Sequence, residues 1–533
     1  MSVAHELAES ISGLSYSDIP ERVRELTRAQ VASVLGAIFA SRFSEDAARV
    51  ERAVRGWAAP GNVTCLPSGQ RLGLREAVLV SSAHSMALDY DDYLYMGHTG
   101  HSAVLAALAL GEAEGHAPED VLTAMVLANE VGGRVGASAV LGPQNGQAWS
   151  FIHAVEAAVV AAKLWRLDRE QTAHAIAIAL YQPTFTLWPG FMGPGSKVLT
   201  AAGPTLAGLD AAAFAREGLT GAAEIFEHPR KGFWANFSWV PLPSMLRGLG
   251  RVWLSDTLAF KRYAGCAYVD TTLDALFEVL AQFRARHLRS LEPDEVRRVQ
   301  VTASLLTVEM DNLSSEHREE RLSAVNVNFS VPLNVAIAIV FGAHEGETFA
   351  SERLTAESSR IAELAARVDL VHDWAMTLEV VRAFDGLGSV SVARQLGPRD
   401  AFDVLAGYRR ELGGPKKTPV RASGLLGQWR TLGKMLRASA RRRPTNRQDL
   451  SDFRMAFPAE VRLETRNGEV FRARRDVPWG APGDPGRAEV AYQKLRREAR
   501  HVLTLERVEE LVRRVRHFEA APVAALVESA RPG

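Results

Sequence analysis

The chain of 533 residues has only two cysteines, Cys65 and Cys266. Two cysteines cannot build a disulfide framework or a cysteine-rich metal site. Charge of one sign is also missing, because 62 Lys and Arg balance 62 Asp and Glu, so nothing in the net charge favours nucleic acid or an anionic membrane as a partner. The N-terminus lacks the basic and apolar regions of a signal peptide, and we expect no apolar stretch of the ~20 residues that span a bilayer. These absences predict a cytoplasmic protein.

Helical periodicity dominates the first half of the chain. Apolar side chains recur at spacings of three and four residues, as amphipathic helices require. The segments with this pattern are 19–40, 102–115, 119–138, 153–164 and 170–181. Several are rich in Ala and Gly, whose small side chains let helix axes approach closely. We therefore expect residues 1–255 to form a bundle with buried central helices.

The pattern changes after about residue 260. Segments 296–304, 324–332 and 457–478 alternate like strands, and the last contains the hairpin signal Asn467-Gly468. Residues 486–518 return to a helical pattern. The sequence predicts a mainly α fold with an α+β part: an all-helical domain from 1–258 and 487–533, and a smaller α+β lid domain from 259–486.

A basic insertion is expected within the lid at about 395–450. Its densest points are Lys416-Lys417 and Arg441-Arg442-Arg443. A run of this kind is usually a solvated surface segment, and the alternative is a patch that binds anions.

The segment 84–104, HSMALDYDDYLYMGHTGHSAV, concentrates titratable side chains. Asp89, Asp91 and Asp92 precede His98 and His101, and a buried unpaired group of this kind costs several kcal/mol (~2–7). Three interpretations are open. The spacing His98-x-x-His101 with nearby carboxylates is suitable for a metal site. An Asp that orients a His is suitable for proton transfer. In the third interpretation the segment is purely structural: an Asp caps a helix and the histidines lie on the surface.

Two further segments carry candidate site residues. Pro194-Gly195-Ser196-Lys197 places a lysine just before a helix start, where a cation opposes the helix dipole but a substrate carboxylate would be bound. Lys261 begins KRYAGCAYVD at the junction of the two patterns, and such junctions are frequent sites of clefts. Cys266, in this apolar setting, is expected to be a small buried residue rather than a nucleophile.

These segments, in this order, resemble the MmgE/PrpD family, which includes 2-methylcitrate dehydratase, cis-aconitate decarboxylase and iminodisuccinate epimerase. The best-matching motifs are HSMALDYDD with the following His, GPGSKVLTAAGPTLAGLDAA, KRYAGC and NFSVPLNVAIAIVFG. The resemblance covers most of the chain outside 395–450. It implies a homodimeric enzyme without metal or other cofactor, whose cleft between a helical domain and a lid moves protons next to a carboxylate.

The resemblance also implies roles for single residues. Asp89 matches the first Asp of the family's DxDD motif, and Lys197 matches the lysine that contacts the substrate carboxylate. The catalytic histidine of the family matches His98 or His101. We therefore predict Asp89, His98, His101 and Lys197 as catalytic residues, and no metal ligands.

Several family positions carry other residues in this chain. Gln147 stands where the family has a His, and His153, six residues further on, is a candidate to replace it. Asp270 replaces the His after the cysteine motif, Leu333 replaces a Tyr, and Tyr93 replaces a Thr. An amide cannot take up a proton as imidazole does, and Leu cannot donate one. We predict Tyr93, Gln147, His153, Asp270 and also Lys261 as substrate-binding residues.

The predicted function is a cofactor-independent lyase or isomerase of specialised metabolism that acts by proton transfer on a small carboxylate or carbonyl compound. The exchanged residues indicate a substrate other than methylcitrate or cis-aconitate, with fewer carboxylates. Two alternatives stay open: a catalytically lapsed member that acts as a binding or scaffold protein, and an enzyme like class II terpene cyclases, whose DxDD motif protonates an alkene.

Overall fold

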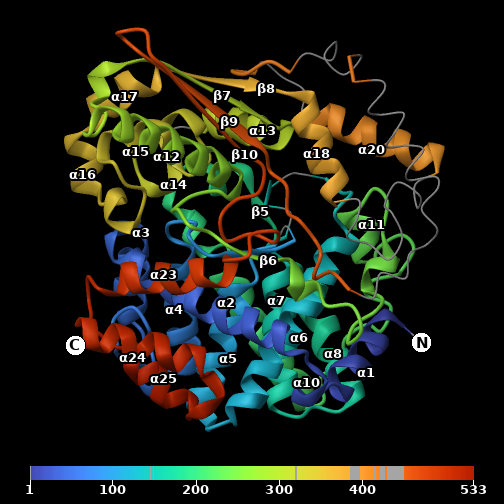
Figure 1. The fold of residues 1–533 in the computed structure, drawn as a ribbon. Helices are drawn as coiled ribbons and strands as arrows, with labels where there is room; N and C mark the ends of the chain where they lie inside the picture. The colour runs from blue at the N-terminus through green and yellow to red at the C-terminus, as the bar shows by residue number, and fades with distance from the viewer. Residues whose placement is uncertain are drawn as a thin grey trace.

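The computed structural model describes residues 2–95, 97–143, 146–147, 149–317, 321–384, 397–411, 416–420, 427–428 and 449–532. The chain is mainly helical, with one four-stranded sheet and three short strand pairs among these residues. Helices from both chain ends form the lower part of Figure 1, and the sheet with its own helices forms the upper part. The predicted mainly α fold with an α+β part is confirmed.

The helices of the first part of the chain follow the predicted segments closely. They are α1 (Val3–Gly13), α2 (Glu21–Ala40), α3 (Glu45–Arg55), α4 (Leu74–Met86), α5 (Gly100–Glu114), α6 (Pro118–Ser138), α7 (Ile152–Leu164), α8 (Arg169–Tyr181), α9 (Trp188–Met192), α10 (Ala202–Arg216) and α11 (Phe233–Phe237). Small residues let the central helices meet closely: a Cβ on Gly208 of α10 would overlap the carbonyl oxygen of Ala154 in α7. α7 is almost wholly buried, as predicted, whereas α10 buries one face and leaves Phe214 exposed.

The C-terminal helices return to this helical part. They are α23 (Arg487–Ala499), α24 (Leu505–Arg516) and α25 (Val523–Ala530). α23 packs along α2, where a Cβ on Gly36 would lie 3.0 Å from Cγ of Lys494. The sequence boundaries of the two domains stay a prediction.

The four-stranded sheet has the order β10-β9-β7-β8 and belongs to the α+β part. Its strands are β7 (Val296–Ala303), β8 (Val368–His372), β9 (Ala459–Thr465) and β10 (Val470–Arg475), with β7 and β8 parallel and the other pairs antiparallel. β9 alternates buried and half-buried residues, because one face of the sheet packs on helices. The predicted hairpin is confirmed, and Gly468 takes the left-handed conformation (φ 87°) that its turn requires.

The helices of the α+β part are α12 (Ala267–His287), α13 (Leu305–Glu316), α14 (Ala324–Val327), α15 (Val331–Phe341), α16 (Ser351–Ala356), α17 (Ser358–Ala365), α18 (Trp374–Phe384) and α20 (Pro398–Glu411). α12 packs against β9 and β10, and α15 against β8. In Figure 1 the α+β part lies directly above the helical part.

The prediction of a strand at 324–332 is wrong. The segment forms α14, a turn and the first residues of α15. Ser323 and Asn326 make a reciprocal capping box, and Asp311 accepts a hydrogen bond of 2.9 Å from the N–H of Val331. These helix-starting contacts outweigh the alternating pattern, because the whole segment is buried and its alternation marks no solvent face.

Three short strand pairs interrupt the helices. They are β1 (Pro60–Thr64) with β2 (Arg71–Leu72), β3 (Asp92–Leu94) with β6 (Leu258–Phe260), and β4 (Gly146–Gln147) with β5 (Thr186–Leu187). The pair β3–β6 matters most, because it brings the Asp-rich segment beside the chain that leads to Lys261.

One apolar stretch is longer than the sequence analysis expected. Residues 195–216 are long and apolar enough to cross a membrane by length and composition, which contradicts the expectation that no such stretch exists. Most of this stretch is buried within the protein, and α10 packs on α4, α7 and α8. A core helix passes the same test, so the stretch is weak evidence for a membrane span.

The predicted basic insertion at 395–450 lies largely outside the described residues, including Arg441-Arg442-Arg443. Within the described residues, Lys416 pairs with Glu309, and Lys417 lies 3.5 Å from Asp311. Its function as surface segment or anion-binding patch stays open.

Candidate active site

A tight turn after α4 brings the first two carboxylates of the segment 84–104, those of Asp89 and Asp91, close together. Asp89 has a left-handed backbone (φ 51°), which Asp tolerates better than most residues. Asp92 then begins β3, which pairs with β6, and the backbone N–H of Lys261 donates to the carbonyl oxygen of Asp91 at 3.2 Å. Asp89 and Asp91 therefore flank the side chain of Lys261.

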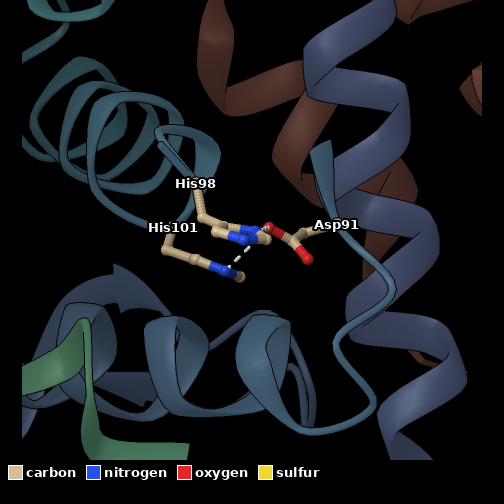
Figure 2. A group of neighbouring side chains, drawn as sticks. All are labelled: Asp91, His98 and His101. Carbon is tan, nitrogen blue, oxygen red and sulfur yellow. Dashed lines mark hydrogen bonds and ion pairs between the residues drawn. The ribbon is translucent and has the colours of Figure 1, made fainter. Parts of the chain in front are cut away.

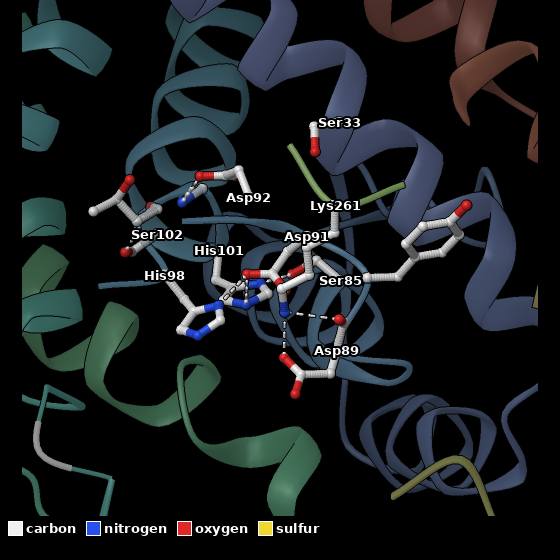
Figure 3. Close-up of polar contacts among 12 residues, drawn as sticks. Ser33, Ser85, Asp89, Asp91, Asp92, His98, His101, Ser102 and Lys261 are labelled. Carbon is white, nitrogen blue, oxygen red and sulfur yellow. Dashed lines mark hydrogen bonds and ion pairs between the residues drawn. The ribbon is translucent and has the colours of Figure 1, made fainter. Parts of the chain in front are cut away.

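Two buried lysines neutralise these carboxylates. Lys261 donates to Oδ1 of Asp89 at 2.7 Å and to Oδ1 of Asp91 at 2.9 Å (Figure 3), and Lys197 donates to Oδ2 of Asp89 at 2.9 Å. Burial alone would raise the pKa of Asp89, but Lys197 and Lys261 hold it below its ordinary value. Burial lowers the pKa of Lys197, whereas the two carboxylates raise the pKa of Lys261. The Lys197 side chain is fully buried and pairs with Asp89 rather than with solvent.

Both histidines of the segment contact one oxygen of Asp91 (Figure 2). Nδ1 of His98 lies 2.6 Å from Oδ2 of Asp91, and Nε2 of His101 lies 3.0 Å from the same atom. Burial would raise the pKa of Asp91, but His98, Lys261 and His101 hold it well below its ordinary value. The two histidines differ in access: the His98 side chain is 20% exposed and the His101 side chain 0%.

The hydrogen bonds fix the protons of these imidazoles. Ser85 donates its only hydroxyl proton to the carbonyl oxygen of Ser82, so its oxygen accepts from Nδ1 of His101 at 2.7 Å. Nε2 of His101 then faces the carboxylate of Asp91 at 3.0 Å. Nδ1 of His98 likewise donates to Asp91, which leaves Nε2 of His98 as the free atom at the accessible end of the network.

Asp92 has the capping role of the structural alternative. Its Oδ2 accepts from Nε2 of Gln30 at 2.7 Å and from the N–H of Gly100, the first residue of α5, at 3.2 Å. Burial and the charge of Asp91 raise the pKa of Asp92.

The predicted substrate-binding residues lie at different depths. Lys261 belongs to the network itself. The Tyr93 ring lies 6.5 Å from that of His98, and Asp270 lies in the first turn of α12, within electrostatic reach of Tyr93 and Lys261. Gln147 is in β4, and its side chain lies outside the described part of the chain.

His153 lies behind His101, in the core. Its ring is 6.0 Å from that of His101, its Nδ1 lies 2.9 Å from Oγ of Ser102, and Ser102 also donates to Glu156. Burial lowers the pKa of His153 and raises that of Glu156, which favours the neutral form of both groups. A direct contact of His153 with a substrate stays a prediction.

Asp91, His98 and His101 are also the described residues whose ligand atoms are grouped closely enough for a metal ion. The surroundings favour protons over a dication. Both Asp91 oxygens are already engaged, one by the Lys261 ammonium, and that charge would repel a metal at the same carboxylate. That the site binds no metal stays a prediction.

Sequence reasoning missed Lys494, which supports the site from α23. This buried ammonium donates to Oγ of Ser33 and to the carbonyl oxygen of Tyr90, both at 2.7 Å. Burial lowers the pKa of Lys494 to about 7. No local pattern marks it, because its partners lie 461 and 404 positions away in the chain.

Fold and site together define a class of protein. It is mainly helical, has an α+β part, and contains a buried network of carboxylates, imidazoles and ammonium groups. Comparison with known proteins is consistent with this class. Residues 5–241 match the MmgE/PrpD N-terminal domain, and residues 263–392 match the MmgE/PrpD C-terminal domain. The chain belongs to the MmgE/PrpD family.

Two curated relatives carry the name cis-aconitate decarboxylase. One, from Aspergillus terreus, is 23% identical over 359 residues, which cover 63% of this chain and 72% of the relative. The other, from Aspergillus terreus strain NIH 2624 / FGSC A1156, is 24% identical over the same shares. At this identity the relatives support a lyase-type enzyme without identifying its reaction.

Proposed function

We propose that the protein is a lyase or isomerase that removes and returns a proton at a carbon next to a carboxylate or carbonyl group. The observation that carries the proposal is the contact between His98 and Asp91. It combines a partly exposed imidazole with a fully buried carboxylate at 2.6 Å, the arrangement of an oriented acid–base histidine.

In this mechanism Nε2 of His98 takes the proton from carbon. Asp91 holds the opposite nitrogen and stabilises the imidazolium that forms. His101 is a positioning residue in this proposal, since both of its ring nitrogens face protein groups: Nδ1 faces Ser85 at 2.7 Å and Nε2 faces Asp91 at 3.0 Å. Between the two histidines, His98 is therefore the catalytic one in this proposal.

The negative charge that develops on the substrate would be stabilised by Lys197. Its ammonium lies over the rings of Phe191 and Phe329, 4.9 and 4.5 Å from their centroids. A cation held among aromatic rings, away from water, stabilises an enolate more strongly than a solvated one. The proton on His98 then returns to the same carbon, to another carbon or to a leaving group, which are the isomerase and lyase outcomes.

The charge balance supports a substrate with few carboxylates. Lys197 and Lys261 are each paired with Asp89 or Asp91, so neither offers a free full charge to a polyanion. We propose a small monocarboxylate or carbonyl compound of specialised metabolism.

The two alternative functions differ in what they require. A class II terpene cyclase needs a protonated middle Asp, whereas the low pKa of Asp91 keeps it ionised. A scaffold has no need of the buried ion pairs, and it would show no turnover in the experiment below.

The test measures exchange of carbon-bound protons with D2O by NMR, using the purified full chain and a panel of small carboxylic acids and ketones. We expect at least one compound to gain deuterium or be converted. His98→Asn should abolish this, whereas His116→Asn should not, because His116 is also 20% exposed but pairs with Glu114 between α5 and α6. Exchange that survives in His98→Asn, or is absent with every compound, would contradict the proposal.

A further inference from the structure

Two polar side chains beside the site have no hydrogen-bond partner among the described residues. The Tyr93 hydroxyl is buried without a partner. The Asp270 side chain is only 2% exposed, and no hydrogen bond or ion pair joins its carboxyl to another described residue. An unsatisfied buried hydroxyl or carboxyl costs about 1–3 kcal/mol or more. Native proteins rarely keep two such groups together without a ligand or water that satisfies them.

The fold places both groups next to the acid–base network. Tyr93 is on β3, opposite Ala259 of β6, and its ring lies beside that of His98. Asp270 lies one helical turn after Cys266, whose thiol is within electrostatic reach of Asp89, Lys261 and Lys197. The N–H of Gly265, just before α12, donates to the carbonyl oxygen of Asp89 at 3.3 Å, so the start of α12 borders the site.

The two groups interact electrostatically. Burial raises the pKa of the Tyr93 hydroxyl and the charge of Asp270 raises it further, yet this hydroxyl makes no hydrogen bond with Asp270. The ammonium groups in reach of Asp270 are engaged elsewhere: Lys261 by Asp89 and Asp91, and Lys494 by Ser33 and Tyr90. Asp274, one turn further along, accepts from Tyr263 and from the N–H of Trp479.

We propose that Asp270 and Tyr93 form a subsite for a hydrogen-bond donor of the substrate, an ammonium or hydroxyl group close to the carbon whose proton moves. Asp270 accepts from this donor, and the Tyr93 hydroxyl contacts the same group. This inference rests on the proposed function, and it narrows the substrate to amino- or hydroxy-substituted carboxylates or carbonyl compounds. Burial raises the pKa of Asp270, and a bound ammonium group would lower it.

The experiment compares ligands that differ only in the donor. The probes are propanoate and its 2- and 3-substituted amino, hydroxy and methoxy derivatives, and their Kd values for the full chain are measured by calorimetry and melting shifts. A methoxy group accepts hydrogen bonds but cannot donate them. We expect the amino or hydroxy acid to bind at least about tenfold more tightly than its methoxy counterpart, the difference of a hydrogen bond to a buried charged group.

Variants assign the difference to Asp270. Asp270→Ala should remove the difference in Kd between the donor-bearing acid and its methoxy counterpart for every pair of probes. Asp270→Asn, which keeps the volume and an accepting oxygen, should remove it for amino acids and keep part of it for hydroxy acids. Asp369→Ala, on the exposed part of β8, is the control and should leave all Kd values unchanged.

Equal binding of methoxy and donor-bearing acids to the wild-type chain would overturn the inference. Absence of binding across the panel would also overturn it, as would a tenfold difference in Kd that survives in Asp270→Ala. The wild-type comparison needs no variant to fold. Failure here is distinct from failure of the proposed function, which is judged by the exchange that depends on His98.

Discussion

One carboxylate oxygen, Oδ2 of Asp91, holds both His98 and His101, at 2.6 Å and 3.0 Å. The other oxygen of Asp91 accepts from Lys261, which in turn holds Asp89 (Figure 3). The site is thus a continuous network of ammonium, carboxylate and imidazole groups that runs from a buried lysine to a partly exposed imidazole. Because these groups pair with one another, removal of one leaves a specific partner unpaired.

Asp91→Asn tests the role of that oxygen. An amide cannot stabilise the imidazolium of His98, so we expect kcat for the reaction that depends on His98 to fall about 10²–10⁴-fold. KM should change far less, because Asp91 is buried and does not touch the substrate. Steady-state kinetics of Asp91→Asn and of the exposed control Asp369→Asn check this. A loss confined to KM would contradict the assigned role.

Asp89→Asn tests the paired lysines. The substitution leaves the buried Lys197 ammonium without a carboxylate, and we expect a loss of roughly 3–5 kcal/mol in the free energy of unfolding. Adding Lys197→Met should recover part of this loss, because the unpaired charge is then gone. Urea denaturation of both single variants and the double variant measures the coupling. Additive losses would show that the two side chains do not stabilise each other.

Most of the fold is predictable from local patterns. The helical periodicity of 119–138 and 153–164 gave α6 and α7 almost residue for residue, and Asn467-Gly468 gave the β9–β10 hairpin. Segment 324–332 misled because it is buried on all sides, so its alternation carries no information about a solvent face.

The site was partly predictable for a related reason. Asp89, His98 and His101 lie in one segment, and Lys197 and Lys261 lie in recognisable motifs. Lys494 sits in a helix whose charged pattern suggests a solvated surface, and only its packing on α2 buries it. Such a long-range contact leaves no mark on its local sequence.

Gly100→Ala tests how tightly α5 approaches the capping carboxylate. An added Cβ would overlap Oδ1 of Asp92 and lie 2.6 Å from Cγ2 of Val34. We expect a loss of about 1–3 kcal/mol in stability, as for an overpacked core. Gly203→Ala, in the first turn of α10, meets no atom within 4 Å and should be neutral or stabilise by up to ~1 kcal/mol. Thermal unfolding of both variants checks the contrast, and equal effects would argue against close packing at Gly100.

Thiol labelling tests the burial of the cysteines. Burial raises the pKa of Cys65 to about 11 and that of Cys266 to about 12, and both thiols are free. Iodoacetamide at pH 8 should therefore modify neither thiol in the native protein and both in urea, since only the thiolate reacts. Mass spectrometry of the labelled chain gives the count. Rapid native labelling of Cys266 would show that it is reactive and accessible.

Lys494→Met tests the support from α23 through its pH dependence. The pKa of Lys494 is about 7 in the folded chain, against an ordinary value of 10.5. Between these pH values the unfolded state binds a proton that the folded state does not, so this group makes folding more favourable as the pH rises. The slope is at most about 1.4 kcal/mol per pH unit. Below pH 7 both states are protonated, and the full cost of the buried charge is present.

Met titrates in neither state, so the stability of the wild-type chain relative to Lys494→Met should increase from pH 7 to pH 10. Urea denaturation of the two proteins at pH 6, 7, 8, 9 and 10 gives this difference. A constant difference across the range would mean that Lys494 keeps an ordinary pKa in the folded protein.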